Sequence, residues 1–249
     1  TPDAASALKD AIAKGNVPQV TLNAYCDGLL GCAEAFAAKP DQKPQALALF
    51  DFVLNLPNVP SQVREAALRG SVLNRGADSF PLVAERLKGE NTDDFFAGLR
   101  VARELNADHG VAAAIADVLP SATPDREVLI LDLFGEGDGD AAGTAVLARV
   151  TDGTPEVRVA ALRAVTRMHF NPAIDTLVRL ASSEEGYIAN VARESLAYFA
   201  GAEGDKALDA MLHNEDPKAR GVAVALIGAG GLDNPGAILL KTAETDTDE

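Results

Sequence analysis

Carboxylates that alternate with glycines are the residues of this chain whose spacing most directly suggests chemistry. In the segment Phe134 to Gly143, the acids are Glu136, Asp138 and Asp140. Such alternation can surround a calcium ion with oxygen ligands. A helix-loop-helix calcium site beginning at Glu136 needs a bidentate glutamate at its twelfth position, where the chain has Leu147. We therefore favour a polar turn in which Asp140 caps the next helix.

The two cysteines, Cys26 and Cys32, lie six residues apart in the segment CDGLLGC. On one continuous helix they would be out of bonding range, but Asp27-Gly28 and Gly31 indicate a break that could bring the thiols together. A disulfide would favour an exported protein, periplasmic or extracellular, and a chain that begins Thr1-Pro2 without an initiator Met agrees with that expectation. The alternative is a pair of ordinary buried thiols.

The three histidines, His109, His169 and His213, share no short spacing with one another or with a nucleophile. We expect structural roles for them in turns. They are also too far along the chain to complete a zinc site with the cysteines. The segment GAGG, Gly228 to Gly231, is typical of a turn that closes a helix. The sequence therefore predicts no catalytic, cofactor-binding or metal-binding residues.

The elements that position these groups are best seen in the segment Thr154 to Glu185, which predicts two helices joined by a turn. Thr154-Pro155 and Asn171-Pro172 are both helix start signals. Each predicted helix has one apolar face, so neither is stable alone. We expect the two to pack antiparallel, with the first face against the second: Val157, Ala161 and Val165 against Ile174 and Leu177.

The same start signal recurs along the chain. It appears at Thr123-Pro124, Thr154-Pro155 and Asp216-Pro217, so the prolines are separated by 31 residues and then by twice 31. Thr92 lies one period earlier. The matching second helices are expected to start near Phe80, His109, Asp140, Asn171, Gly204 and Asn234. Helix pairs at a short period predict an all-α fold, an α-α superhelix in which antiparallel pairs of about 31 residues form a right-handed solenoid.

The pattern at Pro155, Val157, Arg158, Ala161 and Val165 resembles the short HEAT-like repeats of the phycobilisome bilin lyase type. Weaker copies begin at Val63 and Pro217, and the unit at Thr92 departs from the pattern with Phe95 and Phe96. The resemblance covers roughly residues 58 to 242. It implies structural roles between repeats for the arginines of the pattern, which are Arg64, Arg158 and Arg220.

The chain divides by pattern into three parts. Residues 1–57 lack the proline signals and are expected to form a divergent helical cap, residues 58–242 the repeat array, and residues 243–249 an acidic disordered tail. Helices in the cap are expected at Asp3 to Lys14, Val17 to Tyr25, Leu29 to Ala38 and Pro44 to Leu56. We predict one continuous solenoid domain, because Pro57 and Pro60 mark a joint and not a long linker.

Composition and charge restrict the partners. The formal net charge is −15, apolar residues make up 47% of the chain, aromatic residues make up 5%, and there is no Trp. An acidic chain disfavours nucleic acid and anionic membranes and favours a basic protein partner. No apolar run approaches the roughly 20 residues needed to span a bilayer, so we expect no membrane insertion.

We therefore predict a non-catalytic protein-protein interaction scaffold or adaptor that binds along the ridge of its second helices. Polar residues expected on that surface are Arg86, Arg149, Asp175, Arg179 and Asp209. The resemblance implies one alternative, a subunit of a bilin chromophore lyase-type enzyme. A helical-repeat DNA-repair enzyme is a more distant alternative, which the acidic charge and the missing Trp argue against.

Overall fold

The computed structural model describes residues 1–105, 110–183, 186–199, 202–228, 240 and 244. Every regular element in this part of the chain is a helix, which confirms the predicted all-α fold. The chain forms two compact units, Thr1–Ser121 and Ala122–Glu249. Each is a solenoid-like series of helices that pack on their neighbours in chain order.

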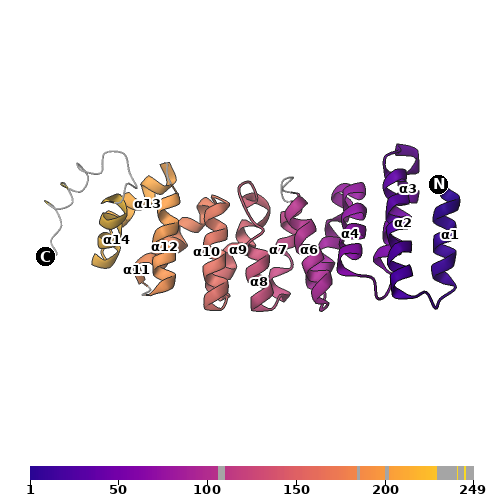
Figure 1. Ribbon diagram of the computed structural model, residues 1–249. Helices are drawn as coiled ribbons and strands as arrows, with labels where there is room; N and C mark the ends of the chain where they lie inside the picture. The colour runs from indigo at the N-terminus through magenta and orange to yellow at the C-terminus, as the bar shows by residue number, and fades with distance from the viewer. Residues whose placement is uncertain (106–109, 184–185, 200–201, 229–239, 241–243, 245–249) are drawn as a thin grey trace. The chain divides into compact units, whose positions relative to one another are not determined.

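The first unit contains seven described α-helices: α1 (Pro2–Ala13), α2 (Gln19–Ala37), α3 (Lys43–Leu54), α4 (Ser61–Arg75), α5 (Phe80–Lys88), α6 (Thr92–Leu105) and α7 (Ala112–Ala116). The expected cap, residues 1–57, lies wholly within this unit. It is not separated from the first repeats, because α3 packs directly on α4 (Figure 1). The boundary after Ser121 was not predicted.

Helix α2 corrects the prediction for the cap. It runs without a break through both Asp27-Gly28 and Gly31, where we expected one helix to end and another to begin. Gly28 has a different role: a Cβ atom there would lie 2.9 Å from Cδ1 of Leu8. The glycine therefore lets α1 approach α2 closely.

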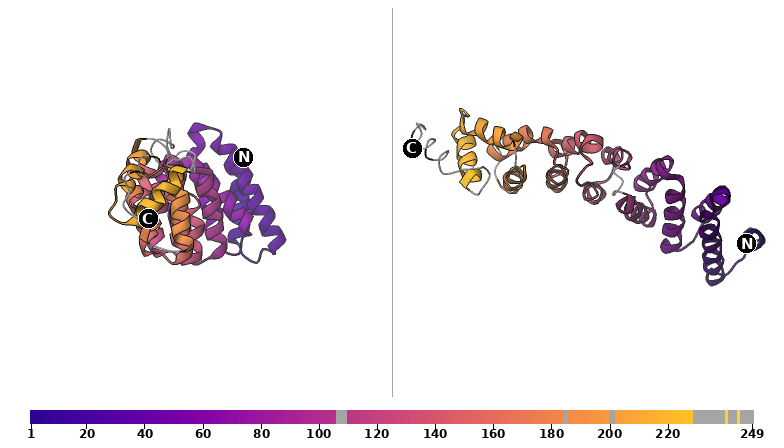
Figure 2. Two further views of the ribbon diagram at one scale, coloured as in Figure 1. Left: turned by 90° about the vertical axis from the view of Figure 1, so that its left-hand side faces the viewer. Right: turned by 90° about the horizontal axis from the view of Figure 1, so that it is seen from above.

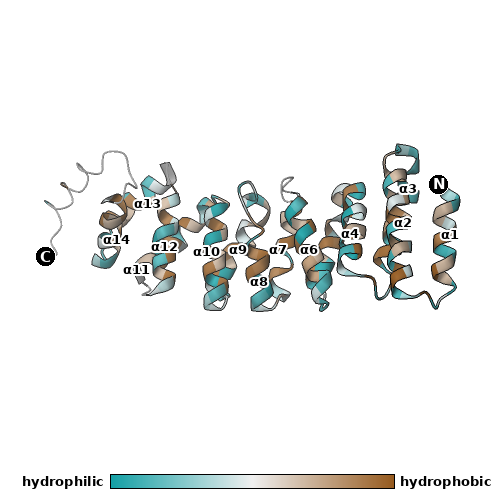
Figure 3. Cartoon of the chain, viewed as in Figure 1, coloured by the Kyte–Doolittle hydropathy of each residue, from teal (hydrophilic) through white to brown (hydrophobic). Residues whose placement is uncertain are grey.

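The second unit also contains seven described α-helices: α8 (Pro124–Leu131), α9 (Gly139–Asp152), α10 (Pro155–Arg167), α11 (Ile174–Ser183), α12 (Tyr187–Tyr198), α13 (Ala202–Leu212) and α14 (Pro217–Gly228). Seen from above, the helices of this unit form two rows (Figure 2). Each labelled helix carries both apolar and polar segments, as expected for helices that bury one face (Figure 3).

The helix starts confirm the repeat period. Helices α4, α6, α8, α10, α12 and α14, here called the first helices, begin 30 to 32 residues apart. The second helices are α5, α7, α9, α11 and α13. Thr154 caps α10 as predicted, since its Oγ accepts a hydrogen bond from the amide of Val157. In α6 the cap is Asn91 and not Thr92, because the Asn91 side chain accepts from the amide of Asp94 at 3.0 Å.

The closest helix pairs differ from the prediction by one helix. Within each unit, a second helix packs most closely on the first helix that comes after it in the chain: α5 on α6, α9 on α10, α11 on α12 and α13 on α14. The expected close pair, α10 with α11, was therefore wrong. Gly153 and Thr154 alone connect α9 to α10, whereas residues 168–173 connect α10 to α11. The shorter connection makes the closer antiparallel neighbour.

The apolar face of α10 is buried as expected, although its neighbours differ. Val157, Ala161 and Val165 are fully buried. The helix packs on α9, α8 and α12. Two of these neighbours, α8 and α12, are themselves first helices, so the outer surface of the second unit includes a row of first helices.

Candidate interaction surface on the first helices

Exposed large apolar side chains gather on the first helices. In the second unit they are Leu129 on α8, Tyr187 and Tyr198 on α12, and Val224 on α14. In the first unit Leu73 lies on α4 and Phe96 on α6, with Val20 on α2. Among the residues described in the second helices, no large apolar side chain is exposed to this degree. Exposed apolar area marks binding surfaces, so these findings favour the first helices over the second.

The two tyrosines stand at the ends of a groove between α10 and α12. Near the starts of these helices, a hollow of about 530 Å³ is lined by Pro155, Glu156, Val159, Tyr187 and Ile188. Near their ends, a second hollow of about 400 Å³ is lined by Arg163, Thr166, Arg167, His169, Val191, Glu194, Ser195 and Tyr198. The N-terminal residues of both helices line one hollow and their C-terminal residues line the other. Helices α10 and α12 therefore run parallel. We call these the start hollow and the end hollow.

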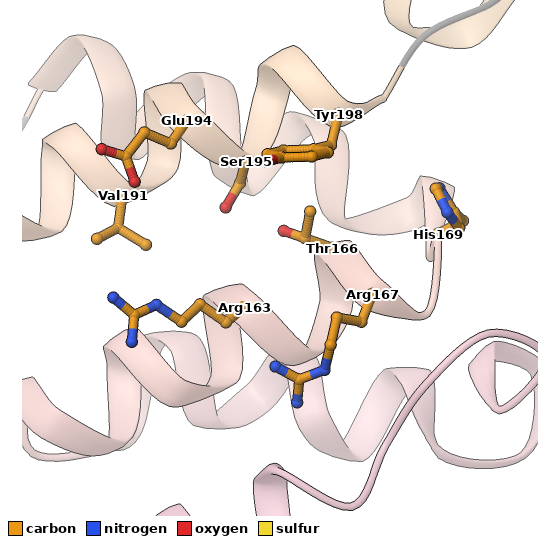
Figure 4. A pocket seen from close by; sticks show the side chains of 8 residues that line it. All are labelled: Arg163, Thr166, Arg167, His169, Val191, Glu194, Ser195 and Tyr198. Atoms are coloured by element: carbon orange, nitrogen blue, oxygen red, sulfur yellow. The ribbon is translucent and has the colours of Figure 1, made fainter.

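The end hollow has a largely buried floor, and its two walls carry different chemical groups. Val191 and Ser195 are almost fully buried beneath it. Arg163, Arg167 and His169 come from α10 and the turn after it, and Glu194 and Tyr198 come from α12 across the groove (Figure 4). One wall is therefore cationic, and the other presents a carboxylate and a phenol.

Arg163 and Tyr187 form a bridge between the hollows. The Arg163 guanidinium donates a hydrogen bond to the Tyr187 hydroxyl at 2.8 Å. Arg163 lines the end hollow and Tyr187 lines the start hollow. The bridge therefore divides the groove into two compartments, and it fixes both side chains before any ligand arrives.

Arg167 is held in place by the end of α8. Its Nε donates to the carbonyl of Phe134 at 3.0 Å, and one terminal nitrogen donates to the carbonyl of Leu131 at 3.0 Å. Carbonyls at a helix C-terminus lack partners within the helix, so a guanidinium there stabilises α8. The Arg167 side chain nevertheless stays 40% exposed. One of its terminal nitrogens also lies 3.8 Å from the Asp132 carboxylate, and the guanidinium points away from the α12 side of the hollow (Figure 4).

His169 has an unusual backbone conformation at the end of the groove. Its φ is +48°, in the left-handed region that favours glycine. It comes directly after the C-cap of α10, where its amide donates to the carbonyl of Thr166 and the amide of Phe170 donates to the carbonyl of Val165, both at 3.0 Å. This paired pattern is a Schellman motif, which usually has glycine at this position. The side chain packs edge-on to Phe199, with ring centroids 6.4 Å apart.

Two of the five surface residues predicted from the sequence are half-buried and bind carboxylates of neighbouring helices. Arg86 lies 3.5 Å from Asp94, and its side chain is only 17% exposed. Arg149 binds Glu127, whose side chain is 3% exposed, and this hydrogen bond raises the pKa of Arg149. Each long side chain therefore reaches a carboxylate on a neighbouring helix, and the role of both arginines in binding stays a prediction.

The other three residues lie at the surface of the second helices. Asp175 lines a hollow of about 600 Å³, together with Lys206 and other residues of α11 and α13. Arg179 is exposed on α11, and Asp209 is exposed on α13, 3.8 Å from Nδ1 of His213. The structure places all three at the surface, and their role in binding stays a prediction.

The arginines of the repeat pattern connect helices, as the resemblance implied. Arg64 on α4 binds Asp94 on α6 at 3.1 Å. Arg158 on α10 donates to the carbonyl of Val150 on α9 at 2.8 Å. Arg220 on α14 donates to the carbonyl of Asn214, just after α13, at 3.0 Å.

The cysteines do not form the disulfide that the sequence left possible. Cys26 and Cys32 are free thiols on the continuous helix α2. Their separation along the helix is about 9 Å, beyond the roughly 7 Å between Cα atoms that a disulfide spans. Burial raises the pKa of the Cys26 thiol, and nearby Asp27 adds to this effect. Of the two alternatives that the sequence left open, the structure therefore has the free thiols.

The glycine-rich acidic turn has a structural explanation. Asp138 is fully buried, accepts a hydrogen bond from the amide of Gly135 at 2.8 Å and occupies the N-cap position of α9. The N-cap residue of α9 is therefore Asp138 and not Asp140, and the described hydrogen bond of its side chain goes to the turn before the helix and not to the first turn of α9. Across the described residues, no group of three or more His, Cys, Asp or Glu side chains could hold a metal ion. His109, Asn234 and residues 229–231 of the predicted GAGG turn lie outside the described residues.

Comparison with known proteins gives no family for this chain. No protein-family model and no curated protein matches it. A similar solved structure is the crystal structure of an engineered protein from a structural genomics consortium, with 18% sequence identity and a TM-score of 0.26. That alignment covers 92% of this chain and 98% of the engineered chain. Among the described helices, none is both long and apolar enough to cross a membrane.

Proposed function

We propose that this protein is a non-catalytic protein-interaction module built from HEAT-like repeats, and that the groove between α10 and α12 is its principal binding surface. The observation that carries the proposal is the exposed apolar area on the first helices, with Tyr187 62% exposed and Tyr198 69% exposed at this groove. Tyrosine suits such a surface because its ring buries apolar area while its hydroxyl remains hydrated.

The dimensions of the groove fit a peptide segment. Helix α10 with its turn, Pro155 to His169, extends over about 20 Å. Two hollows of about 530 and 400 Å³ can each receive a side chain. The fixed positions of Arg163 and Arg167 reduce the entropy lost on binding. These features favour recognition of a segment within a partner protein.

Charge acts at two scales in this proposal. The net charge of −15 attracts a partner that is basic overall. The α10 wall of the groove is a local exception, because it presents the exposed side chain of Arg163. The predicted second-helix surface with Asp175, Arg179 and Asp209 remains a separate candidate site for a basic partner.

Site-specific photo-cross-linking tests the proposal. A photoreactive phenylalanine replaces Tyr198 in the groove or, as the matched control, Asp209 on the exposed face of α13. We expect a partner protein to be linked through one defined peptide from position 198 and not from position 209. A synthetic copy of that peptide should compete, and Tyr187→Ala, introduced into the protein that carries the photoreactive residue at position 198, should strongly reduce the yield of the product.

Two outcomes oppose the proposal. Cross-links from position 209 alone would show that the binding surface lies on the second helices and not in the groove. Cross-links from neither position, together with a measured catalytic activity of the purified protein, would contradict an interaction module. The bilin lyase alternative stays a prediction, which co-purification of a bilin pigment would support.

A further inference from the structure

We infer that the groove recognises an extended partner segment with two apolar side chains three or four residues apart and one acidic residue between them, which binds Arg163. This inference rests on the proposed function and adds the chemistry of the bound segment. It depends on the spacing of the two hollows, on the bridge between them and on the unlike walls.

The spacing comes from helix geometry. The start hollow is centred near residue 157 of α10 and the end hollow near residue 166. At about 1.5 Å per residue, the centres lie roughly 13 Å apart along α10, and the lining residues of α12 give roughly 10 Å. An extended chain advances about 3.3 Å per residue, so three or four residues connect the hollows. A helical segment would need about seven to nine.

The bridge places a cation between the two apolar positions. Arg163 is exposed, and its guanidinium gives one described hydrogen bond, to Tyr187. A guanidinium has five N–H donors in a planar fork that matches a carboxylate. A segment lying over the bridge therefore meets Arg163 midway between its two apolar anchors.

The walls limit how much negative charge the segment carries and where it points. Arg163, Arg167 and His169 form the α10 wall, while Glu194 faces them from α12 and Glu156 lines the start hollow. A central acid directed toward α10 is attracted. Acids at the outer positions would approach Glu156 or Glu194 and be repelled. The surface thus fits a segment with one central acid better than a polyacidic one.

An extended segment also fits the width of the groove. Neighbouring packed helices lie about 8 to 10 Å apart, and a helix with its side chains is about 10 Å wide. An extended chain with alternating side chains can direct every second residue into the space between α10 and α12. The central acid then shares a face with both anchors when these are four residues apart.

Fluorescence anisotropy with defined probes tests this inference. The probe is a labelled peptide containing Leu-Thr-Glu-Thr-Leu, compared with peptides in which the central Glu is Lys, or in which the leucines lie seven residues apart. We expect the Glu probe to bind at least about tenfold more tightly than the Lys probe, as for one charge-assisted contact. The probe with seven-residue spacing should bind more weakly.

Charge reversal gives the second arm. Arg163→Glu should weaken the Glu probe about tenfold and favour the Lys probe. Arg163→Gln should weaken the Glu probe without favouring Lys. The matched control is Arg103→Glu at an exposed position of α6 in the first unit, which should leave both affinities unchanged. Circular dichroism checks that each variant keeps its helix content.

The outcomes separate this inference from the proposed function. Equal binding of the Glu and Lys probes, tighter binding of the seven-residue spacing, or no binding of any probe at millimolar concentration would each overturn the inference. In each case, a partner cross-linked from position 198 would leave the proposed function standing. If no partner is cross-linked from position 198, both this inference and the proposed function are contradicted.

Discussion

The two units use arginine differently. In the first unit, the described arginine contacts end mainly on carboxylates: Arg64 on Asp94, Arg69 on Glu104 and Arg100 on Glu65. In the second unit they end mainly on main-chain carbonyls: Arg158 on Val150, Arg167 on Leu131 and Phe134, and Arg193 on Ala181. The same side chain thus joins neighbouring helices through two kinds of acceptor.

The difference teaches where each unit is sensitive. Val150, Leu131 and Ala181 lie in the last turns of α9, α8 and α11, whose carbonyls lack amide donors within the helix. A main-chain carbonyl cannot be titrated or removed by substitution. An exposed carboxylate is screened by salt and neutralised by acid. The stability of the first unit should therefore depend more on salt and pH. The stability of the second unit should depend more on the arginine side chains themselves.

The largest expected effect concerns an arginine–carboxylate pair of the second unit, that of Arg149 with buried Glu127. Arg149→Met leaves a carboxylate that is only 3% exposed without its cation. We expect the free energy of unfolding to fall by about 3 to 5 kcal/mol in urea titrations. The double variant with Glu127→Met should recover most of that loss. A single-variant loss below about 1 kcal/mol would show that Glu127 is hydrated.

The next effect compares the two acceptor types directly. Arg193→Met removes two hydrogen bonds to the Ala181 carbonyl and should cost about 1.5 to 3 kcal/mol. Arg69→Met removes a pair whose side chains are 53% and 42% exposed, and it should cost at most about 1 kcal/mol. In 1 M NaCl the Arg69 cost should vanish and the Arg193 cost should persist. If salt reduces the cost of both substitutions equally, the proposed difference between carboxylate and carbonyl acceptors is contradicted.

A smaller effect concerns the ends of corresponding helices. Helix α4 ends at Gly76 with φ of +65°, whereas α10 is followed by His169 with φ of +48°. His169→Gly should raise the free energy of unfolding by up to about 1 kcal/mol, and Gly76→Ala should lower it by at least as much. His169→Gly should also weaken partner binding, because strain retained at a groove residue indicates a functional role. Stabilisation with unchanged binding would show that His169 has no part in recognition.

The smallest effect is a pH dependence in the first unit. The hydrogen bond from Arg69 lowers the pKa of Glu104 below its ordinary 4.5. The pair therefore adds stability above about pH 4.5, and this is lost as the pH falls through the lowered pKa. Because Glu104 is exposed, the loss should stay below about 1 kcal/mol. Unfolding titrations of the wild type and Glu104→Gln should differ at pH 7 and converge near pH 3.

Much of the fold was predictable because its signals are local. The Thr-Pro and Asp-Pro starts depend on backbone geometry within one turn, so they located α8, α10 and α14. The packing order was also readable, since the short connection at Gly153-Thr154 favours α9 with α10. The apolar faces of α10 and α11 favoured the wrong pair. The predicted helix break at Gly28 was wrong for a related reason. In the sequence, a glycine that makes room for Leu8 of a neighbouring helix cannot be distinguished from a glycine that ends a helix.

The candidate site was less predictable, because exposure depends on distant neighbours. Periodicity showed that Arg86 and Arg149 lie off the apolar faces, but it could not show that Asp94 and Glu127 lie within reach. Likewise, helix periodicity does not show that Tyr187 and Tyr198 are exposed, because their exposure depends on how α12 packs against its neighbours. Their separation of eleven residues, about three helical turns, was a signal that one face carries both.

Fluorine NMR of protein labelled with 3-fluorotyrosine tests the central claim most directly. The chain has three tyrosines, with Tyr187 and Tyr198 at the groove and Tyr25 on α2 as an internal control. On titration with the peptide identified by cross-linking, we predict that the resonances of Tyr187 and Tyr198 shift together and saturate at one affinity, while that of Tyr25 stays unchanged. Saturable binding that leaves both groove tyrosines unshifted would contradict the assignment of the groove as the binding surface.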